Sequence, residues 1–515
     1  MFASKSWWFG DQQEDVVGDV TQKKELCCTA TLYEHQHKAI EWLQSQENGG
    51  MLCLTMGLGK SLTVSYWSLM VEKAETILLV VSKSLVANWI SMLDQFFPSL
   101  SYDILHADIG KDPRKYENKN NVRFIITTYD VVMSMASLHS INMLVLRKGF
   151  NRTKHTMASE GKGSWLFKTR FDVIIADESQ IFRNPCGRLF SAMLGLTANK
   201  YVCLTGTPIQ NSFDDLYTQM KWMNIPGIDQ FETFDQKYFD ENNLSNYVLM
   251  MGYEDAGIQL PECHEHDIEL TFTTNEAKAY EMLRTETMEE LGKGEDVKNK
   301  SKQHVHILAL ITKMRFACLC IGLSFRKQNI LTVPADLRQL LKNPMSEYWC
   351  NSTKFSSARS LIAHIVEKKE KVIVFSTFWT ALKEFGEGLK RLMHIHPISV
   401  QGSMDIEYRQ SMIKTFKTSS VHPVMLLTFQ IGAEGMNLTE ANHIIFLDSW
   451  WSPSVSRQAI ARSLRIGQTK PVHIYKFRMK GSIEERVYEI VQSKSEIVEQ
   501  FETGVITSDV FKAIL

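Results

Sequence analysis

A glycine-rich loop follows an apolar run near the start of the chain. The segment Leu54–Ser61 reads LTMGLGKS and comes directly after the strand-like run MLCL. Glycines allow backbone amides to wrap closely around phosphate groups. Lys60 would neutralise the terminal phosphates, and Ser61 would offer its hydroxyl to Mg²⁺. Because Leu54 stands where the strict G-x-x-x-x-G-K-S/T pattern has its first glycine, a chance G-K-S at a helix start remains the alternative.

Two adjacent carboxylates end a hydrophobic run further along the chain. VIIADES places Asp177 and Glu178 at the end of an expected strand. The carboxyl edge of a parallel sheet is where such sheets bind ligands. Asp177 would hold Mg²⁺, directly or through water, and Glu178 would orient and deprotonate an attacking water. Two solvated acids at an exposed strand end are the plain alternative, which the upstream phosphate loop disfavours.

Two further motifs would complete the contacts to a phosphate chain. LTGTPIQN suits a tight turn at another strand end, where Thr205, Thr207 and Gln210 would sense the γ-phosphate, unless it is only a turn. In QAIARSLRIGQ, Arg462 and Arg465 stand three apart, which would place both on one helix face. Two guanidiniums there would stabilise the charge on a transferring phosphoryl group. A generic basic helix face is the alternative.

Short runs rich in Val and Ile alternate with helix-length segments in two parts of the chain. This pattern is typical of parallel sheets covered by helices. The predicted strands are 77–81, 123–129, 173–177 and 201–206 in the first part, and 371–377, 397–402, 424–428, 443–448 and 472–477 in the second. We therefore predict an α/β fold of two lobes with parallel sheets, joined by a helical insertion. The predicted boundaries are 1–25 for an N-terminal arm, 26–225 for lobe 1, 226–350 for the helical connector, 351–490 for lobe 2 and 491–515 for a tail or bracing helix.

The composition excludes several classes of protein. Of 515 residues, 44% are hydrophobic and 22% charged, which is an ordinary globular balance. The net charge of −1 excludes a wholly basic nucleic-acid binder, so positive charge for DNA must be local to a groove. Nine scattered cysteines without a C-x-x-C pair favour reduced thiols in an intracellular compartment. No signal peptide and no membrane span are expected.

Three features leave alternatives open. Residues 147–170 carry seven Lys or Arg and one Glu, which suits a solvated loop or a DNA-backbone contact. Residues 482–501 are expected to form a helix that braces lobe 2, with a brake or partner helix as the alternative. A candidate zinc cluster fits no common zinc spacing, so core or loop thiols are the better interpretation. Its residues would be Cys263, His264, His266, Cys318 and Cys320.

In this order the motifs resemble those of the Snf2 branch of the superfamily 2 helicase-like ATPases. The series runs LYEHQHKAIEWL, TMGLGKS, SKSLVANW, ITTYD, DESQ, LTGTPIQN, FSTFWTALK, QGSMD, IGAEGMNL, DSWWSP and QAIARSLRIGQ. It covers about residues 30 to 490, and LTGTPIQN and the final two motifs are highly specific. The resemblance implies two RecA-like lobes that close over Mg·ATP.

The resemblance also implies roles for individual residues. Gln36 would read the adenine, Arg462 and Arg465 would be arginine fingers, and Gly435 and Asn437 would couple nucleotide to DNA. The phosphate loop would consist of Met56, Gly57, Leu58, Gly59, Lys60 and Ser61. A family block near the same cleft is matched by Trp450, Trp451 and Pro453. The expected DNA contacts are Lys83, Ser84, Asn88, Trp89, Gln401, Gly402 and Ser403.

The function implied by the resemblance is ATP-driven translocation on double-stranded DNA without net strand separation. Such a protein would remodel or displace DNA-bound proteins, for example histones or transcription factors, and would act in the nucleus as a monomer. Departures from the family pattern at Thr55, Gln180, Glu434 and Ala461 leave open a weak or inactive ATPase that serves as a binding platform for transcription. A strand-separating helicase is the other alternative.

Overall fold

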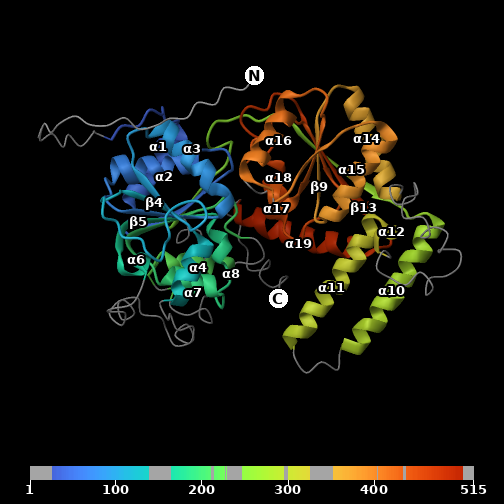
Figure 1. Ribbon diagram of the computed structural model, residues 1–515, viewed down its shortest axis with the longest axis horizontal. Coiled ribbons are helices and arrows are strands. Elements are labelled where there is room, and N and C mark those ends of the chain that lie inside the picture. The colour runs from blue at the N-terminus through green and yellow to red at the C-terminus, as the bar shows by residue number, and fades with distance from the viewer. Residues whose placement is uncertain are drawn as a thin grey trace, which may run out of the picture.

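The structure is a computed structural model that shows two lobes lying side by side, with a pair of helices projecting from the second (Figure 1). The N-terminal arm expected at 1–25 lies outside the described residues, as do residues 147–163 of the basic segment. The residues described are 26–138, 164–209, 214–226, 228, 246–294, 300–324, 352–402, 404–432 and 436–502.

Lobe 1 is built on a parallel sheet, which has seven strands within the described ranges. Their order across the sheet is β3-β4-β2-β5-β6-β1-β7. Four of them, β2, β4, β5 and β6, were predicted from apolar runs, and these predictions are confirmed. The strands are β1 (Gly49–Leu54), β2 (Ile77–Val81), β3 (Tyr102–Leu105), β4 (Phe124–Thr128), β5 (Arg170–Asp177), β6 (Thr197–Leu204) and β7 (Val248–Met251).

Both faces of this sheet are covered, as the uninterrupted apolar runs require. In β2, Ile77, Leu79 and Val81 pack into one hydrophobic core, and Leu78 and Val80 pack into another. Successive strand residues point to opposite faces, so each face carries its own core. The covering segments are α1 (Glu34–Ser45), α2 (Lys60–Tyr66), the π-helix η1 (Trp67–Val71), η2 (Lys83–Leu85), α3 (Val86–Phe96), α4 (Tyr129–Leu138), α6 (Trp165–Lys168), η4 (Ser179–Phe182), α7 (Arg188–Leu194) and α8 (Asp214–Trp222).

Lobe 2 repeats the same architecture. Within the described residues its sheet has six parallel strands in the order β10-β11-β9-β12-β13-β8. All five strands predicted for this part of the chain are present. They are β9 (Val372–Ser376), β10 (Ile398–Val400), β11 (Val424–Thr428), β12 (His443–Phe446) and β13 (Val472–Met479). The helices are α14 (Thr353–Glu367), α15 (Trp379–Met393), α16 (Ile406–Thr418), α17 (Phe429–Gly432), α18 (Pro453–Ile460) and α19 (Ile483–Glu502).

The segment 226–350, predicted to be a helical connector, contains strands as well. β7 pairs with β1, so the sheet of lobe 1 continues beyond residue 225. β8 (Cys263–Leu270) pairs with β13, so the sheet of lobe 2 begins well before residue 351. β8 escaped prediction because it is an edge strand with mostly polar, exposed side chains. The helices of this segment are α10 (Thr274–Gly294), α11 (Lys300–Leu319) and α12 (Ile321–Ser324).

Two smaller expectations also need correction. The boundary drawn at residue 490 falls inside α19, which braces lobe 2 as predicted through a buried ion pair between Glu484 and Lys354 on α14. The end of the predicted basic loop is not a loop, because Trp165–Lys168 form α6 and β5 begins at Arg170. Apolar side chains of α6 pack into the core of lobe 1, which fixes this stretch.

The candidate zinc residues do not come together. Cys318 and Cys320 are buried in hydrophobic cores, whereas Cys263 is exposed on β8. Among the described residues, no group of three or more His, Cys, Asp or Glu side chains is arranged to hold a metal ion. In the same part of the chain, none of the helices has the length and apolar character needed to cross a bilayer.

Substituting Gly49 tests the close packing of β1, the strand that leads into the phosphate loop. Its φ is +93°, and a Cβ there would lie 2.1 Å from the carbonyl oxygen of Tyr201 on β6. Gly257→Ala is the matched control, because its φ is +66° and a Cβ there would have open space. Left-handed strain lowers the free energy of unfolding of both variants by about 1–2 kcal/mol. Overpacking lowers that of Gly49→Ala by about 1–3 kcal/mol more. Equal losses in denaturant unfolding would contradict this packing.

Candidate nucleotide site and nucleic-acid groove

The loop between β1 and α2 has the backbone of a phosphate-binding loop. Gly57 and Gly59 have φ values of +94° and +79°, which side chains with a Cβ adopt only at a cost. A Cβ on Gly59 would also lie 2.4 Å from the amide nitrogen of Gln36. Because α2 begins at Lys60, the loop delivers its backbone to a helix N-terminus, where anions are favoured. Ser61 lies in the first turn of this helix.

Lys60 lies where three motifs meet. Its Nζ donates to the carbonyl oxygen of Leu54 at 2.6 Å. A Cβ on Gly206 of the LTGTPIQN motif would lie 3.7 Å from the same nitrogen. Burial lowers the pKa of Lys60, while the nearby carboxylates of Glu178 and Asp177 oppose that shift. The ammonium group is thus surrounded by the groups expected to bind and cleave a phosphate chain.

Asp177 is held rigidly at the end of β5. Its Oδ2 accepts from the indole nitrogen of Trp89 at 2.7 Å, and its Oδ1 accepts from the backbone amide of Glu178 at 3.0 Å. The hydroxyl of Tyr129 donates to its backbone carbonyl at 2.7 Å. Burial, and then the charge of Glu178, raise the pKa of Asp177 to about 6, against the lowering effects of Trp89 and Lys60.

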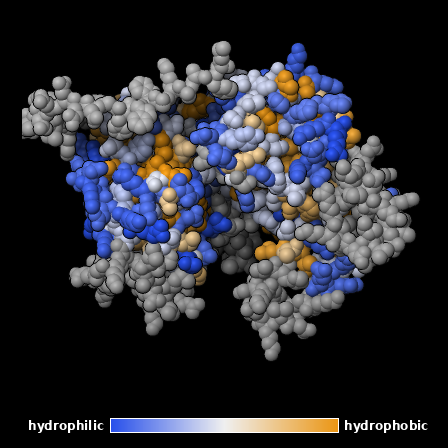
Figure 2. All heavy atoms as spheres, in the orientation of Figure 1, coloured by the Kyte–Doolittle hydropathy of each residue, from blue (hydrophilic) through white to orange (hydrophobic). Residues whose placement is uncertain are grey.

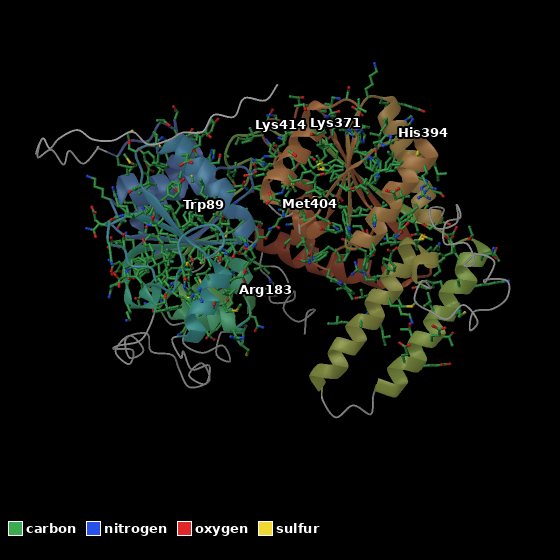
Figure 3. The ribbon with its side chains drawn as sticks, in the orientation of Figure 1. Trp89, Arg183, Lys371, His394, Met404 and Lys414 are labelled. Atoms are coloured by element: carbon green, nitrogen blue, oxygen red, sulfur yellow. The ribbon has the colours of Figure 1, made fainter. Side chains whose placement is uncertain are left out.

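Trp89 therefore does not belong to the DNA contacts in which it was predicted. Its side chain is only 2% exposed, and Figure 3 shows it within lobe 1. A tryptophan in the middle of α3 packs inward when its neighbours fill the same hydrophobic core, and here its polar nitrogen meets a buried carboxylate. Trp89 therefore supports the nucleotide site from the interior of lobe 1, through its hydrogen bond to Asp177.

Glu178 is strained and is contacted from both lobes. It is a non-glycine residue at φ +52°, a conformation that costs free energy and is common at functional sites. Its Oε2 accepts from the side-chain amide of Gln180 at 2.5 Å and from that of Gln458, on α18 of lobe 2, at 3.4 Å. Gln180, one of the departures from the family pattern, thus donates a hydrogen bond to Glu178.

A buried glutamine connects the two motifs of lobe 1 that follow β5 and β6. Ser179 donates to the side-chain oxygen of Gln219 at 2.5 Å. The amide nitrogen of Gln219 donates to the backbone carbonyl of Pro208 at 3.0 Å. Gln219 lies on α8, far from either motif in sequence, and no local pattern identifies it.

The hydroxylated residues of LTGTPIQN line the same region. The amide of Thr207 donates to Oγ1 of Thr205 at 3.0 Å, which closes the expected tight turn. The buried hydroxyl of Thr207 has no hydrogen-bond partner among the described residues, so it is available to a ligand. Gln210, the third predicted member, lies outside the described residues.

Both predicted arginines face the phosphate loop from lobe 2. Arg462 is buried, and its Nη2 lies 3.9 Å from Sδ of Met56. Nη2 of Arg465 would lie 3.9 Å from a Cβ on Gly57. They do not share a helix face as predicted, because α18 ends at Ile460 and both arginines lie in the turns that follow.

Hydrogen bonds fix these turns to the rest of lobe 2. The side-chain amide of Gln468 donates to the carbonyl oxygens of Thr439 and Ala441 at 3.0 and 3.2 Å. The amide of Leu438 donates to the carbonyl of Arg462 at 2.9 Å. Asn437, expected near the nucleotide, is exposed beside this contact, and Gly435 lies outside the described residues.

Two residues that the sequence did not identify hold the phosphate loop. The hydroxyl of Tyr253, after β7, donates to the carbonyl of Met56. Nε2 of His35 on α1 lies 3.0 Å from the carbonyl of Leu58. Gln36, predicted to read adenine, is buried beside the loop, and its oxygen accepts the amide of Tyr33 at 2.9 Å.

The residues at the end of β5 suit a magnesium ion that a nucleotide brings with it. Burial, and then the charge of Glu178, raise the pKa of Asp177, so a cation bound there would stabilise its ionised form. Mg²⁺ prefers hard oxygen ligands and is usually bound by one or two protein groups, with phosphates and waters completing its shell. The Asp177 carboxylate and the Ser61 hydroxyl are such groups, and both lie near Lys60.

A hollow of about 530 Å³ lies between the lobes, apart from the phosphate loop. From lobe 1 it is lined by Lys83, Ser84 and Asn88, and from lobe 2 by Gly402 and Met404. Figure 3 places Met404 on the side of lobe 2 that faces lobe 1, and Figure 2 shows mostly hydrophilic residues over the described surface of both lobes. Predicted DNA contacts from the two lobes therefore line one space.

Charged groups in and beside this hollow are partly paired. Nζ of Lys83 lies 2.7 Å from Oδ2 of Asp108, and Nη2 of Arg409 donates to the carbonyl of Gly402 at 2.9 Å. The backbone amide of Gln401, which is half-buried, donates to the sulfur of Met404 at 3.4 Å. Ser403 lies outside the described residues. Lys83 and Arg409 line the hollow together with the acidic Asp405.

Comparison with known proteins identifies two domains. The SNF2-related domain matches residues 35–320, and the helicase conserved C-terminal domain matches residues 353–467. The putative helicase 172L of Invertebrate iridescent virus 6 is 26% identical, over 92% of this chain and 91% of its own length. The probable global transactivator of Orgyia pseudotsugata multicapsid polyhedrosis virus is 24% identical, over 89% and 88%.

The second of these viral relatives is a baculovirus global transactivator, which this chain also resembles in its compact size. The ATP-dependent helicase FUN30 of Saccharomyces cerevisiae is 24% identical, but the chain spans only 46% of its length. The SNF2-related match alone covers more than half of the present chain and contains the phosphate loop and both acidic residues. The chain therefore belongs to the SNF2-related family of superfamily 2 helicase-like proteins, and it is an ATP-hydrolysing enzyme.

Proposed function

We propose that the chain is a DNA-stimulated ATPase that translocates on double-stranded DNA and displaces or remodels DNA-bound proteins without separating the strands. The observation that carries the proposal is that nucleotide residues and predicted DNA residues span the same two lobes. Glu178 is contacted by Gln458 across the cleft, and the hollow lined by Lys83 and Gly402 is formed by the same pair of lobes. A change in lobe spacing therefore alters both sites together.

In this proposal each side chain of the nucleotide site has one role. Lys60 leaves the carbonyl of Leu54 and binds the terminal phosphates, whose negative charge its ammonium group neutralises. Asp177 and Ser61 hold Mg²⁺, which neutralises phosphate charge when it is bound. Glu178 orients the attacking water and accepts its proton. Gln36 contacts the adenine.

Lobe 2 supplies positive charge to the reaction. Arg462 and Arg465 already face the phosphate loop, so a small closure brings their guanidiniums onto the γ-phosphate. Fixed cations stabilise the charge on the transferring group better than solvent does. Thr207 and Gln210 sense whether the γ-phosphate is present. Gly435 and Asn437 couple nucleotide binding to DNA binding.

The hollow between the lobes would grip the duplex by its backbone. Lys83, Ser84, Asn88 and Gly402 line the hollow and offer amides, a hydroxyl and a cation rather than a surface for reading bases. Gln401 and Ser403 are proposed as further duplex contacts, because they belong to the same sequence motif as Gly402. Such contacts position DNA without sequence preference. Because Lys83 is already paired with Asp108, DNA phosphates must compete for it, and binding is modest and salt-sensitive.

The names of the relatives support the proposed activity. They include putative and ATP-dependent helicases, a helicase/translocase and a global transactivator. Histones or transcription factors are then the displaced proteins, the nucleus is the site of action, and the chain works as a monomer. Because several relatives carry the name helicase, strand separation is the alternative that needs a direct test.

A pair of displacement assays separates translocation from unwinding. A translocase on duplex DNA displaces the third strand of a triplex when ATP is present, while a forked duplex stays paired. We expect triplex displacement that requires Lys60, with no fork unwinding beyond the level seen without ATP. Fork unwinding without triplex displacement would contradict the proposal and favour a strand-separating helicase.

The pH dependence of hydrolysis tests the role of Trp89. Its indole hydrogen bond lowers the pKa of Asp177, so Trp89→Phe raises that pKa further. Because the reaction needs the Asp177 carboxylate ionised, the acidic limb of kcat/KM against pH moves to higher pH in this variant. Trp67→Phe is the matched control, since the Trp67 indole nitrogen is buried without a hydrogen-bond partner in the described part of the chain. An unshifted limb in Trp89→Phe would contradict this role.

Salt dependence tests the proposed duplex contact. Lys83→Ala removes one phosphate contact, so we expect several-fold weaker duplex binding and a log–log salt slope smaller by about 1. Lys111→Ala is the control, because Lys111 is equally exposed and also paired at 2.7 Å, with Asp103, but does not line the hollow. Binding is measured by fluorescence anisotropy. Equal effects of the two substitutions would remove Lys83 from the DNA contacts.

A further inference from the structure

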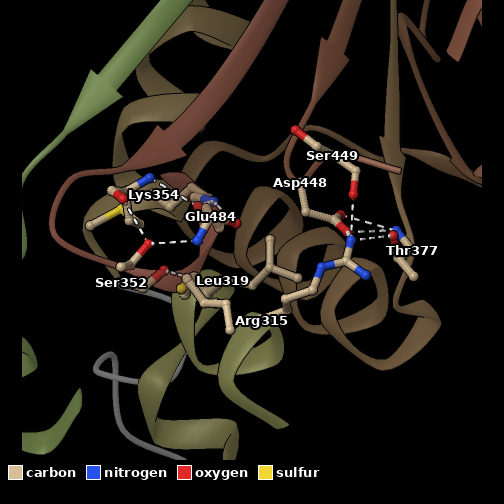
Figure 4. A network of polar contacts seen from close by, with 12 residues as sticks. Arg315, Leu319, Ser352, Lys354, Thr377, Asp448, Ser449 and Glu484 are labelled. Carbon is tan, nitrogen blue, oxygen red and sulfur yellow. Dashed lines mark hydrogen bonds and ion pairs between the residues drawn. The ribbon is translucent and has the colours of Figure 1, made fainter. Parts of the chain in front are cut away.

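A buried arginine of the helical insertion contacts the segments of lobe 2 that follow β9 and β12. Arg315 lies near the end of α11, and its side chain is only 3% exposed. Its Nη2 lies 3.3 Å from Oδ2 of Asp448 and 3.3 Å from Oγ1 of Thr377, and it donates to the carbonyl of Ser449 (Figure 4). Burying a charge in this way requires close pairing and defined geometry.

Aromatic faces complete the surroundings of this guanidinium. Cζ of Arg315 lies 4.8 Å from the ring centre of Trp451 and 5.7 Å from that of Phe378. Asp448 is itself buried and accepts the backbone amide of Thr377 at 3.0 and 3.2 Å. The planar group thus joins two segments of lobe 2, residues 377–378 after β9 and residues 448–451 after β12.

That stretch leads directly into the arginine segment. Trp451 stands two residues before Pro453, where α18 begins. α18 carries Gln458, whose amide contacts Glu178, and the turns after α18 carry Arg462 and Arg465. α18 spans only Pro453–Ile460, so its start and its end are parts of one short rigid element.

We infer that Arg315 is a positioning residue for ATP hydrolysis: it fixes the start of α18 and thereby the approach of the two arginines to the phosphate loop. This inference rests on the finger roles proposed for Arg462 and Arg465. Because Arg315 lies on α11, this role makes the α10–α11 pair a part of the structure on which ATP hydrolysis depends. A lysine cannot replace Arg315, because an ammonium group has neither the planar face for Trp451 nor several fixed donors.

Other contacts between α11 and lobe 2 differ in kind, among them the packing of Phe316 against Phe378 and two sets of polar bonds. Ser352 donates to the carbonyl of Leu319, the last residue of α11, at 2.6 Å, and Lys354 pairs with Glu484 at 2.6 Å (Figure 4). These bonds join α11 and α14 to α19 and do not involve residues 448–451. They hold the insertion in place, whereas Arg315 makes hydrogen bonds to Asp448 and Ser449 in the stretch before α18.

The test compares matched arginine-to-lysine substitutions in the full-length chain. Arg315→Lys is set against Arg359→Lys, a buried arginine of the same lobe on α14 that donates to Ser356 of its own helix. Steady-state hydrolysis with saturating duplex DNA gives kcat and KM for ATP, and thermal unfolding gives the midpoint. We expect Arg315→Lys to lower kcat about 10-fold or more with KM unchanged. Arg359→Lys is expected to keep the wild-type kcat.

A double variant shows whether Arg315 acts through the fingers. Arg465→Ala is expected to lower kcat, and adding Arg315→Lys to it should lower kcat by less than about 2-fold more, because both remove one contribution. If Arg465→Ala is impaired but Arg315→Lys keeps the wild-type kcat, or if the two losses multiply, the inference is overturned. If Arg465→Ala keeps the wild-type kcat, the finger role itself fails, and the inference with it.

A second variant guards against a folding defect. If Arg315→Lys does not fold, Trp451→Leu is measured in the same way, because it removes the aromatic face on which Arg315 stacks and leaves the guanidinium and its hydrogen-bond partners in place. A lower kcat with unchanged KM supports the inference. A wild-type kcat in Trp451→Leu overturns it, since the contact between Arg315 and Trp451 would then have no effect on hydrolysis.

Discussion

The negative charge of Asp177 and Glu178, held where the buried half of β5 ends, is the constraint around which the molecule is arranged. Burial of the carboxylate, and then repulsion from the adjacent Glu178, raise the pKa of Asp177. Trp89 from α3 and Lys60 from the phosphate loop oppose this shift, and Gln180 donates a hydrogen bond to Glu178. The pKa of Asp177 stays raised in the protein alone, so the site favours a ligand that brings a cation.

Because that charge lies at the edge of one lobe, the other lobe completes the site only by approaching it. Gln458 already contacts Glu178, and Arg462 contacts Met56 in the phosphate loop. The lobes are therefore linked by polar contacts that nucleotide can strengthen or replace. The same approach changes the hollow on which the proposed duplex grip depends. Arg315 extends this linkage to the helical insertion.

The sequence predicted what local chemistry dictates and missed what depends on distant partners. The runs at β2 and β4 are buried at every residue, so their apolar character alone identified them. β8 was missed because backbone pairing with β13, rather than apolar side chains, makes it a strand. The motif residues Lys60 and Asp177 were found by their spacing and setting. Trp89 was misplaced and Tyr253 and Arg315 were missed, since their partners lie far away in the chain.

The most direct test of the account is ATP hydrolysis by the intact chain with no nucleic acid, single-stranded DNA, duplex DNA and duplex RNA. If one movement of the lobes couples both sites, duplex DNA raises kcat severalfold or more, and the other additions have much smaller effects. A rate that is the same under all four conditions would contradict the coupling. Absence of hydrolysis throughout would mean that the departures at Thr55, Gln180 and Ala461 leave only a binding platform.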